Sequence, residues 1–213
     1  ASQSKSLQSD DFWYGNHHKN GIAILAQEKL AAKIGPIDKK APWSIVPIII
    51  SGKFSFNLLA VWTRVERKYI LSLDRALDIY AGFLKKSPSV IIGDFNANAI
   101  WDNPNKETDF TRVANRLENE FGLRSAYHDF YNEQYGEETY ATHHFRWHKD
   151  EPFHIDYCFI PAAWKLQKVQ IGSYDDWGAI SDHCPLIVDI DLQSKSVESD
   201  AGMDFRNYRK VLR

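Results

Sequence analysis

The chain has 213 residues, of which 44% are hydrophobic and 25% charged, as is typical of one globular domain with a sizeable core. Its net charge of −2 excludes attraction of nucleic acid by overall charge, so such binding would need a local basic surface. No apolar stretch is long enough to span a bilayer and no signal peptide opens the chain, so we expect a cytoplasmic protein without membrane contacts. We expect the globular part at 12–192, between polar segments at 1–11 and 193–213.

In chain order, apolar runs of strand length outnumber helical patterns. Strands are predicted at 21–25, 45–50, 56–62, 89–92, 154–160, 168–171 and 186–190. Apolar residues recur at helical spacing between Ile70 and Leu84, and again over 111–121, where Gly122 is a natural C-terminal stop. These helices would cover sheet faces, which predicts an α/β sandwich of two packed sheets.

The segment Gly93-Asp94-Phe95-Asn96 follows the apolar run at 89–92. Because side chains two residues apart on an extended segment point the same way, we expect Asp94 and Asn96 to lie side by side. A carboxylate beside a carboxamide can bind a hard cation, order a water molecule and hold a phosphate oxygen. Taken alone, a strand that ends in Gly-Asp is most often only a turn.

Two later segments add ionisable groups beside apolar strands. Residues 154–160 alternate ionisable with apolar side chains, which predicts a strand with His154, Asp156 and Cys158 on one side. Ser181-Asp182-His183 precedes a further apolar run at 184–188. Acidic or imidazole groups therefore recur beside three expected strands.

These three segments, in this order, resemble the signature of the endonuclease/exonuclease/phosphatase family, the DNase I-like phosphoesterases. Further segments resemble a small bacterial branch of it: 98–102 (NAIWD), 125–128 (SAYH) and 172–177 (GSYDDW). The likeness runs from about Phe12 to Ile190. It implies an αββα fold, with two packed, mostly antiparallel sheets flanked by helices.

The resemblance implies a role for each matching residue. Asp94 would orient or deprotonate the attacking water, and Asn96 would hold the reacting phosphate. His183 would donate a hydrogen bond or charge to the phosphate oxygens, with Asp156 behind it to fix the ring. Asp182 would be a ligand of Mg²⁺, or of Mn²⁺, which neutralises the phosphodiester while water attacks.

The same resemblance makes Asn98, Trp101 and His154 candidates for contact with substrate. Core packing is the alternative for Trp101, which adjoins the first motif.

The amino-terminal part departs from the family pattern. Members usually open with a strand that ends in a metal-site Asn and a second that ends in Gln-Glu, whose Glu is the principal metal ligand. This chain reaches the family-like Phe12-Trp13-Tyr14-Gly15 almost at once, and if Gln3 holds the family's Gln position, Ser4 stands where the Glu should be. Glu28 lies on a later expected strand and is not assigned as a ligand. The remaining ligands should bind Mg²⁺ weakly.

Three explanations follow, in order of preference: a trimmed piece of a longer enzyme with the N-terminal strands missing, a degenerate member, or a chain completed by another chain. The oligomeric state stays open.

Basic side chains gather at 64–68, 143–149 and 206–210. The segment 143–149 (HHFRWHK) mixes imidazoles, a guanidinium and aromatic rings, which suits stacking on bases and gripping phosphates. For the other two, a solvated loop of mixed charge is the alternative. A zinc site made by these histidines is disfavoured, because no cysteine lies nearby and the spacing matches no structural zinc pattern. Cys158 and Cys184 are expected to be buried free thiols, with a disulfide as the alternative.

The sequence therefore predicts a metal-dependent phosphodiesterase that hydrolyses P–O bonds, most plausibly a nuclease acting on DNA or RNA. One alternative is a catalytically impaired module that binds phosphate or nucleic acid without the metal. Another is a phosphomonoesterase or lipid-headgroup phosphatase, since specificity in this family is implied to lie in loops.

Overall fold

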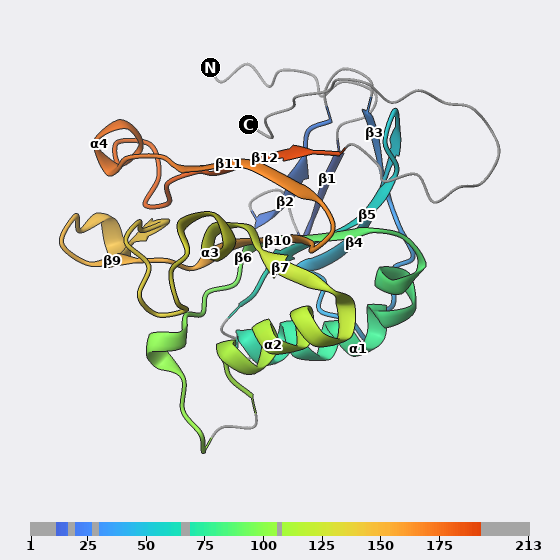
Figure 1. Ribbon diagram of the computed structural model, residues 1–213, viewed down its shortest axis with the longest axis horizontal. Helices are drawn as coiled ribbons and strands as arrows, with labels where there is room; N and C mark the ends of the chain where they lie inside the picture. Colours follow the sequence, from blue (N-terminus) through green and yellow to red (C-terminus); the bar gives the residue numbers. More distant parts are fainter. Residues whose placement is uncertain (1–11, 17–19, 27–29, 65–68, 106–107, 193–213) are drawn as a thin grey trace.

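The computed structural model describes residues 12–16, 20–26, 30–64, 69–105 and 108–192 (Figure 1). A six-stranded sheet forms its centre, with the strands in the spatial order β3 (Leu30–Ile34), β4 (Ile45–Gly52), β5 (Phe56–Trp62), β6 (Ser89–Asp94), β10 (Asp156–Pro161) and β7 (Leu123–Ser125). Strands β5 and β6 run parallel, and the other neighbouring pairs are antiparallel.

Helices cover one face of this sheet and further strands cover the other (Figure 1). The helical side carries α1 (Ile70–Lys86) and α2 (Phe110–Phe121). The opposite side carries two antiparallel strand pairs, which are β1 (Phe12–Asn16) with β2 (Asn20–Ile24) and β11 (Lys165–Ile171) with β12 (Leu186–Asp191). The predicted α/β architecture of packed, mostly antiparallel sheets with helices is confirmed, and among the described residues the second sheet consists of these two separate pairs.

Shorter elements lie at one end of the molecule, to the left in Figure 1. They are the turns of 3₁₀ helix η2 (Ala99–Trp101) and η3 (Phe145–Trp147), the helices α3 (Ala126–Tyr131) and α4 (Tyr174–Trp177), and the short strand pair β8 (His143–His144) with β9 (Pro152–Phe153).

Strand β5 shows how the sheet divides the core in two. Its side chains alternate between the faces, as the pleat requires. Leu59 and Val61 pack among residues of α1 and α2, whereas Leu58 and Ala60 pack in the second cluster, which includes Val188 of β12. Because both faces are covered, β5 is apolar at every position except Asn57.

The two long helices confirm the predicted helical patterns. Gly122 ends α2 in the left-handed conformation (φ 65°), where a residue without Cβ is favoured. Arg116 of α2 joins the helices, because its guanidinium donates to the carboxylates of Asp74 and Asp78 on α1 at 2.6 and 2.7 Å.

The amino terminus of α2 is held by two carboxylates. Asp109 is the N-cap and accepts from the N–H of Arg112 at 3.0 Å. Asp102, which directly follows η2, accepts from the N–H groups of Phe110 and Thr111, each at 2.9 Å. These bonds satisfy donors that have no partner inside the helix, and they attach the loop carrying Trp101 to α2.

Several elements differ from the sequence prediction. Strands β1, β3 and β7 and helix α3 were not predicted as separate elements. β3 is a half-buried edge strand that contains Lys33, and β7 has only three residues, so neither shows a clear apolar pattern. The strand predicted at 154–160 begins at Asp156, which leaves His154 before it.

Both cysteines, Cys158 and Cys184, are buried free thiols, as expected. Within the described residues, no helix combines the length and the apolar character needed to cross a membrane. The basic segment at 206–210, the greater part of the one at 64–68, and the polar segments predicted at 1–11 and 193–213 lie outside the described residues.

We expect Asp102→Ala to lower the free energy of unfolding by about 1–2 kcal/mol, because two N–H groups at the start of α2 lose their acceptor. Urea denaturation measures this change. Asp175→Ala is the matched control, since it removes an exposed carboxylate paired with Lys149, and it should stay within about 0.5 kcal/mol of the unmodified protein. Equal stability of the two variants would contradict the capping role.

Candidate active site

The first motif occupies the end of β6. Gly93 has a positive φ of 140°, and a Cβ at this position would collide with the carbonyl oxygen of Val61 on the neighbouring strand β5. The glycine therefore allows β5 and β6 to pair through Gly93 and Asp94, the first two residues of the motif. Phe95 is fully buried on the helical side, and its N–H donates to the carbonyl of Ile155 at 2.9 Å.

Asp94 and Asn96 lie together, as predicted, although Asn96 sits in a left-handed turn (φ 45°) rather than on an extended strand. The Asn96 backbone N–H donates to Asp94 Oδ1 at 2.8 Å, and its Nδ2 donates to Asp94 Oδ2 at 2.6 Å. Nδ2 also donates to the carbonyl of Thr63 at 3.1 Å. The amide therefore orients the carboxylate, and both side chains are half-buried.

Asp156 begins β10 directly opposite Asp94 in the antiparallel register. Its Oδ2 accepts a hydrogen bond from Nδ1 of His183 at 2.9 Å. Since a carboxylate can only accept, this bond places a proton on Nδ1. The other ring nitrogen, Nε2, is left to contact a substrate or an ion. The predicted Asp behind a His is therefore present as a contact.

The three groups shift each other's pKa values. Burial and the negative charge of Asp156 raise the pKa of Asp94 to about 7, against the opposing effects of His183 and the Asn96 hydrogen bonds. Burial alone would lower the pKa of His183. The hydrogen bond and charge of Asp156, with the charges of Asp94 and Asp182, outweigh burial and raise the pKa of His183 to about 9. Near neutral pH the site thus pairs a carboxyl group poised to lose its proton with an imidazolium.

Hydrogen bonds to the backbone join the segments that carry these residues. Thr142, fully buried, accepts at Oγ1 from the N–H groups of Ile155 and Asp156, each at 3.0 Å. Its carbonyl accepts from the N–H of Cys184 at 2.7 Å, and the N–H of His144 donates to the carbonyl of Asp182 at 2.7 Å. Three segments far apart in the sequence are thereby fixed against one another.

These bonds bring His143 next to Asp182 and His183. The ring centroids of the two histidines are 4.5 Å apart, and Nε2 of His143 lies 3.6 Å from Asp182 Oδ2. One ligand atom from each of the three residues lies within 4.8 Å of the others, so together they could hold a metal ion. No local pattern indicates this grouping, because it depends on the backbone bridge between His143 and His183.

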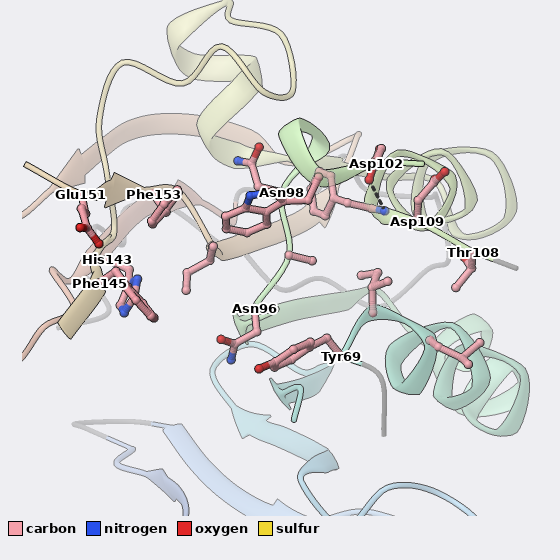
Figure 2. A pocket seen from close by; sticks show the side chains of 16 residues that line it. Tyr69, Asn96, Asn98, Asp102, Thr108, Asp109, His143, Phe145, Glu151 and Phe153 are labelled. Carbon is pink, nitrogen blue, oxygen red and sulfur yellow. Dashed lines mark hydrogen bonds between the residues drawn. The ribbon is translucent and has the colours of Figure 1, made fainter. Parts of the chain in front are cut away.

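A large cavity of about 950 Å³ opens beside Asn96 and His143. Figure 2 shows His143 and Phe145 on one side of it, and Thr108 and Asp109 on the opposite side. Its walls are mainly apolar and aromatic, with Tyr69, Trp101, Phe145 and Phe153. Trp101 is 44% exposed and its ring centroid lies 5.0 Å from that of Phe153, so this predicted substrate-binding residue does face the cavity.

The other two predicted contacts with substrate, Asn98 and His154, are buried; Asn98 is among the residues that line the cavity, whereas His154 is not. Asn98 is only 2% exposed, and its Nδ2 donates to Glu138, to the carbonyl of His154 and to the hydroxyl of Tyr157. His154 is 3% exposed, with Nδ1 bonded to the carbonyl of Tyr140 at 2.8 Å. Burial lowers the pKa of His154, which therefore stays neutral. Both side chains support the site from within the core.

Comparisons with known proteins show relatives of this fold. Similar solved structures include a 3'-5' exonuclease (NExo) from Neisseria meningitidis, with 19% identity and a TM-score of 0.61 over 85% of this chain and 79% of that one. The endonuclease domain of TRAS1, a telomere-specific non-LTR retrotransposon, has 16% identity and a TM-score of 0.56 over 86% and 80%.

A functionally unknown conserved protein from Enterococcus faecalis V583 has 18% identity and a TM-score of 0.54 over 80% and 71%. At these identities the likeness shows the fold. Among curated proteins, none matches this sequence. The sequence profile of the Endonuclease/Exonuclease/phosphatase family, whose members hydrolyse phosphoester bonds, matches residues 3–183 and so takes in Asp94, Asp156 and His183. The chain is a member of the Endonuclease/Exonuclease/phosphatase family.

Proposed function

We propose that this protein is a metal-dependent phosphodiesterase that hydrolyses P–O bonds in DNA or RNA by attack of water. The observation that carries the proposal is the position of Asp156, opposite Asp94 in the sheet and hydrogen-bonded to His183. Asp156 thereby links Asp94, the candidate base, to His183, a candidate acid of opposite charge. General acid–base chemistry uses such a pair.

Asp94 is the proposed base that accepts a proton from the attacking water. A base works best when its pKa lies near the working pH, and the pKa of Asp94 is raised to about 7. The two hydrogen bonds from Asn96 hold the carboxylate in one orientation, so that the water approaches from a fixed direction. The amide oxygen of Asn96 remains available to orient the water, and the residue borders the cavity next to the reacting phosphate.

His183 is the proposed stabiliser of negative charge on the phosphate oxygens. With Nδ1 bound to Asp156, its Nε2–H is the donor left for a phosphate oxygen. The charge of Asp156 keeps the ring protonated at neutral pH, so the donor carries a positive charge as the transition state forms.

A divalent metal would neutralise the phosphodiester and polarise the bond that breaks. Mg²⁺, or Mn²⁺, bound with the help of Asp182 stays our prediction for hydrolysis. The donor set in the described residues fits Mg²⁺ poorly, however, because the group around Asp182 contains one carboxylate and two imidazoles, whereas Mg²⁺ prefers six oxygen ligands.

The cavity beside Asn96 supports a substrate with aromatic groups next to the phosphate. Exposed rings of Trp101 and Phe145 on its walls offer surfaces on which nucleobases can stack, and Arg146 lies 4.9 Å over the ring of Phe145. The acidic residues Asp102, Asp109 and Glu151 also border the cavity. They disfavour a second phosphate there, so we expect the cavity to receive a base from a single strand or an unpaired position.

We expect Asp94→Asn to reduce hydrolysis by about 10²–10⁴-fold and to leave the fold intact, because the new side chain keeps the shape but cannot take a proton. Steady-state hydrolysis of a labelled single-stranded oligonucleotide measures the rate, and circular dichroism checks the fold. Asp175→Asn, an exposed acid elsewhere, is the control. Unchanged turnover in Asp94→Asn would refute the role of the base. An unmodified protein that binds the oligonucleotide without cleaving it would favour the binding-module alternative.

The rate should depend on pH as a bell with limbs near pH 7 and pH 9. It rises as Asp94 loses its proton, with a pKa of about 7, and falls as His183 loses its proton, with a pKa of about 9. Asp156→Asn removes a charge that raises both pKa values, so both limbs should move to lower pH. A pH profile of kcat/KM for the two proteins tests this, and limbs that stay in place would separate Asp156 from the acid–base pair.

Trp101→Ala should raise KM for a single-stranded oligonucleotide by about tenfold or more, because a stacked base contributes about 1–3 kcal/mol. Trp13→Ala is the matched control, since Trp13 is similarly exposed, at 46%, but does not line the cavity. If both variants keep the original KM, the cavity does not receive the base.

A further inference from the structure

We propose that His143, Asp182 and His183 form a binding site for a borderline divalent transition metal such as Zn²⁺, distinct in its preference from the Mg²⁺ of the proposed hydrolysis. The two imidazoles and the carboxylate suit such an ion, because nitrogen ligands favour zinc, copper and nickel, whereas magnesium selects oxygen. This metal site shares Asp182 and His183 with the site of the proposed hydrolysis. It does not depend on that hydrolysis, since metal binding is measured without substrate.

The spacing of the ligand atoms is close to what a small ion requires. Atoms bound to zinc at about 2.0–2.2 Å in a tetrahedron are about 3.3–3.5 Å apart. The distance from His143 Nε2 to Asp182 Oδ2 is 3.6 Å, and one atom from each of the three residues lies within 4.8 Å of the others. Small side-chain rotations would therefore bring the three ligands onto one ion, with a fourth position left for water.

His183 has the supporting contact that is typical of a metal-binding histidine. Such a ligand almost always donates its other ring N–H to a carboxylate or carbonyl, and Nδ1 of His183 donates to Asp156. This bond orients the ring and leaves Nε2 for the ion. Nδ1 of His143 is buried without a partner in the described part of the chain, so we expect His183 to be the stronger ligand.

The backbone around the ligands is already fixed. His143 and His183 form a backbone bridge, the His144 N–H donates to the carbonyl of Asp182, and Thr142 binds both Cys184 and the start of β10. Ligands on segments held this way lose little freedom when the ion binds. The side chains of His143, Asp182 and His183 are 13%, 26% and 33% exposed, so the ion has an entry path from the cleft.

Occupation of this site should oppose hydrolysis. The ion would displace the Nε2 proton of His183 to solvent and bind the nitrogen that the proposed mechanism aims at the phosphate, and it would share Asp182 with Mg²⁺. Zn²⁺ should therefore inhibit Mg²⁺-supported cleavage.

Isothermal titration of metal-free protein with Zn²⁺ tests the site directly. We expect the unmodified protein to bind one Zn²⁺ ion per chain. The affinity of His143→Gln should be at least about tenfold weaker, as expected for loss of a ligand. His148→Gln is the matched control, since His148 lies on the same loop with a side chain that is 59% exposed, and its affinity should stay within about twofold. Mg²⁺ affinity should not change in either variant.

Equal Zn²⁺ affinity in His143→Gln and the unmodified protein, or no Zn²⁺ binding at all, would overturn the proposal. If His143→Gln fails to fold, NMR of the unmodified protein decides instead: Zn²⁺ should shift the ring signals of His143 and His183 but not of His148, and a response confined to other histidines would refute the site. Cleavage with Mg²⁺ but no Zn²⁺ binding would remove only this site, whereas Zn²⁺ binding without cleavage under any condition would remove only the proposed hydrolysis.

Discussion

The antiparallel pairing of β10 with β6 is the constraint on which the site depends, because it sets Asp156 directly across from Asp94. Two carboxylates at neighbouring strand ends, both partly shielded from water, repel each other and resist ionising together. The imidazolium of His183, bonded to Asp156, offsets part of that repulsion. A single pairing in the sheet therefore brings together two carboxyl groups with different partners, since Asn96 donates to Asp94 and His183 donates to Asp156.

The loops around this pairing are not free to drift. Thr142 binds the start of β10 through its hydroxyl and the segment after His183 through its carbonyl. A threonine with no exposed surface thus holds three parts of the chain at once. Behind it, Asn98 ties η2 to the segment before β10, so the wall that carries Trp101 is attached to the same frame. The acidic residues of the site and the cavity wall that carries Trp101 are therefore held by connected hydrogen bonds.

Much of the fold could be predicted from the sequence because its signals are local. The run 58–62 is apolar on both faces and of strand length, and the region after Ile70 repeats at helical spacing, so β5 and α1 follow from local patterns. Asp94 and Asn96 lie together as predicted, but a left-handed turn at Asn96, and not an extended strand, brings them together. Those of Asp156 and His183 followed from their resemblance to the family's motifs.

The remaining parts of the site depend on contacts that no local pattern encodes. His154 was expected beside Asp156 on a strand, but the strand begins two residues later and the ring turns into the core toward Tyr140. Asn98 was predicted to contact substrate, and in the structure its amide donates to Glu138 and Tyr157. His143 lies next to Asp182 because a backbone bridge joins His143 to His183, 40 residues later in the sequence. Which way a polar side chain turns is decided by its tertiary neighbours.

Gly93 and Asp94 are adjacent, but the structure holds them for unrelated reasons. The backbone of β5 fills the space where a side chain at Gly93 would go, so any other residue there must push two central strands apart. Asp94 is half-buried at the end of β6, and an isosteric amide would fit in its place. Selection for folding alone would therefore retain Gly93 and allow Asp94 to be replaced. Selection for catalytic turnover would retain both residues. The two positions together could separate chains that have kept this architecture from chains that have also kept its chemistry.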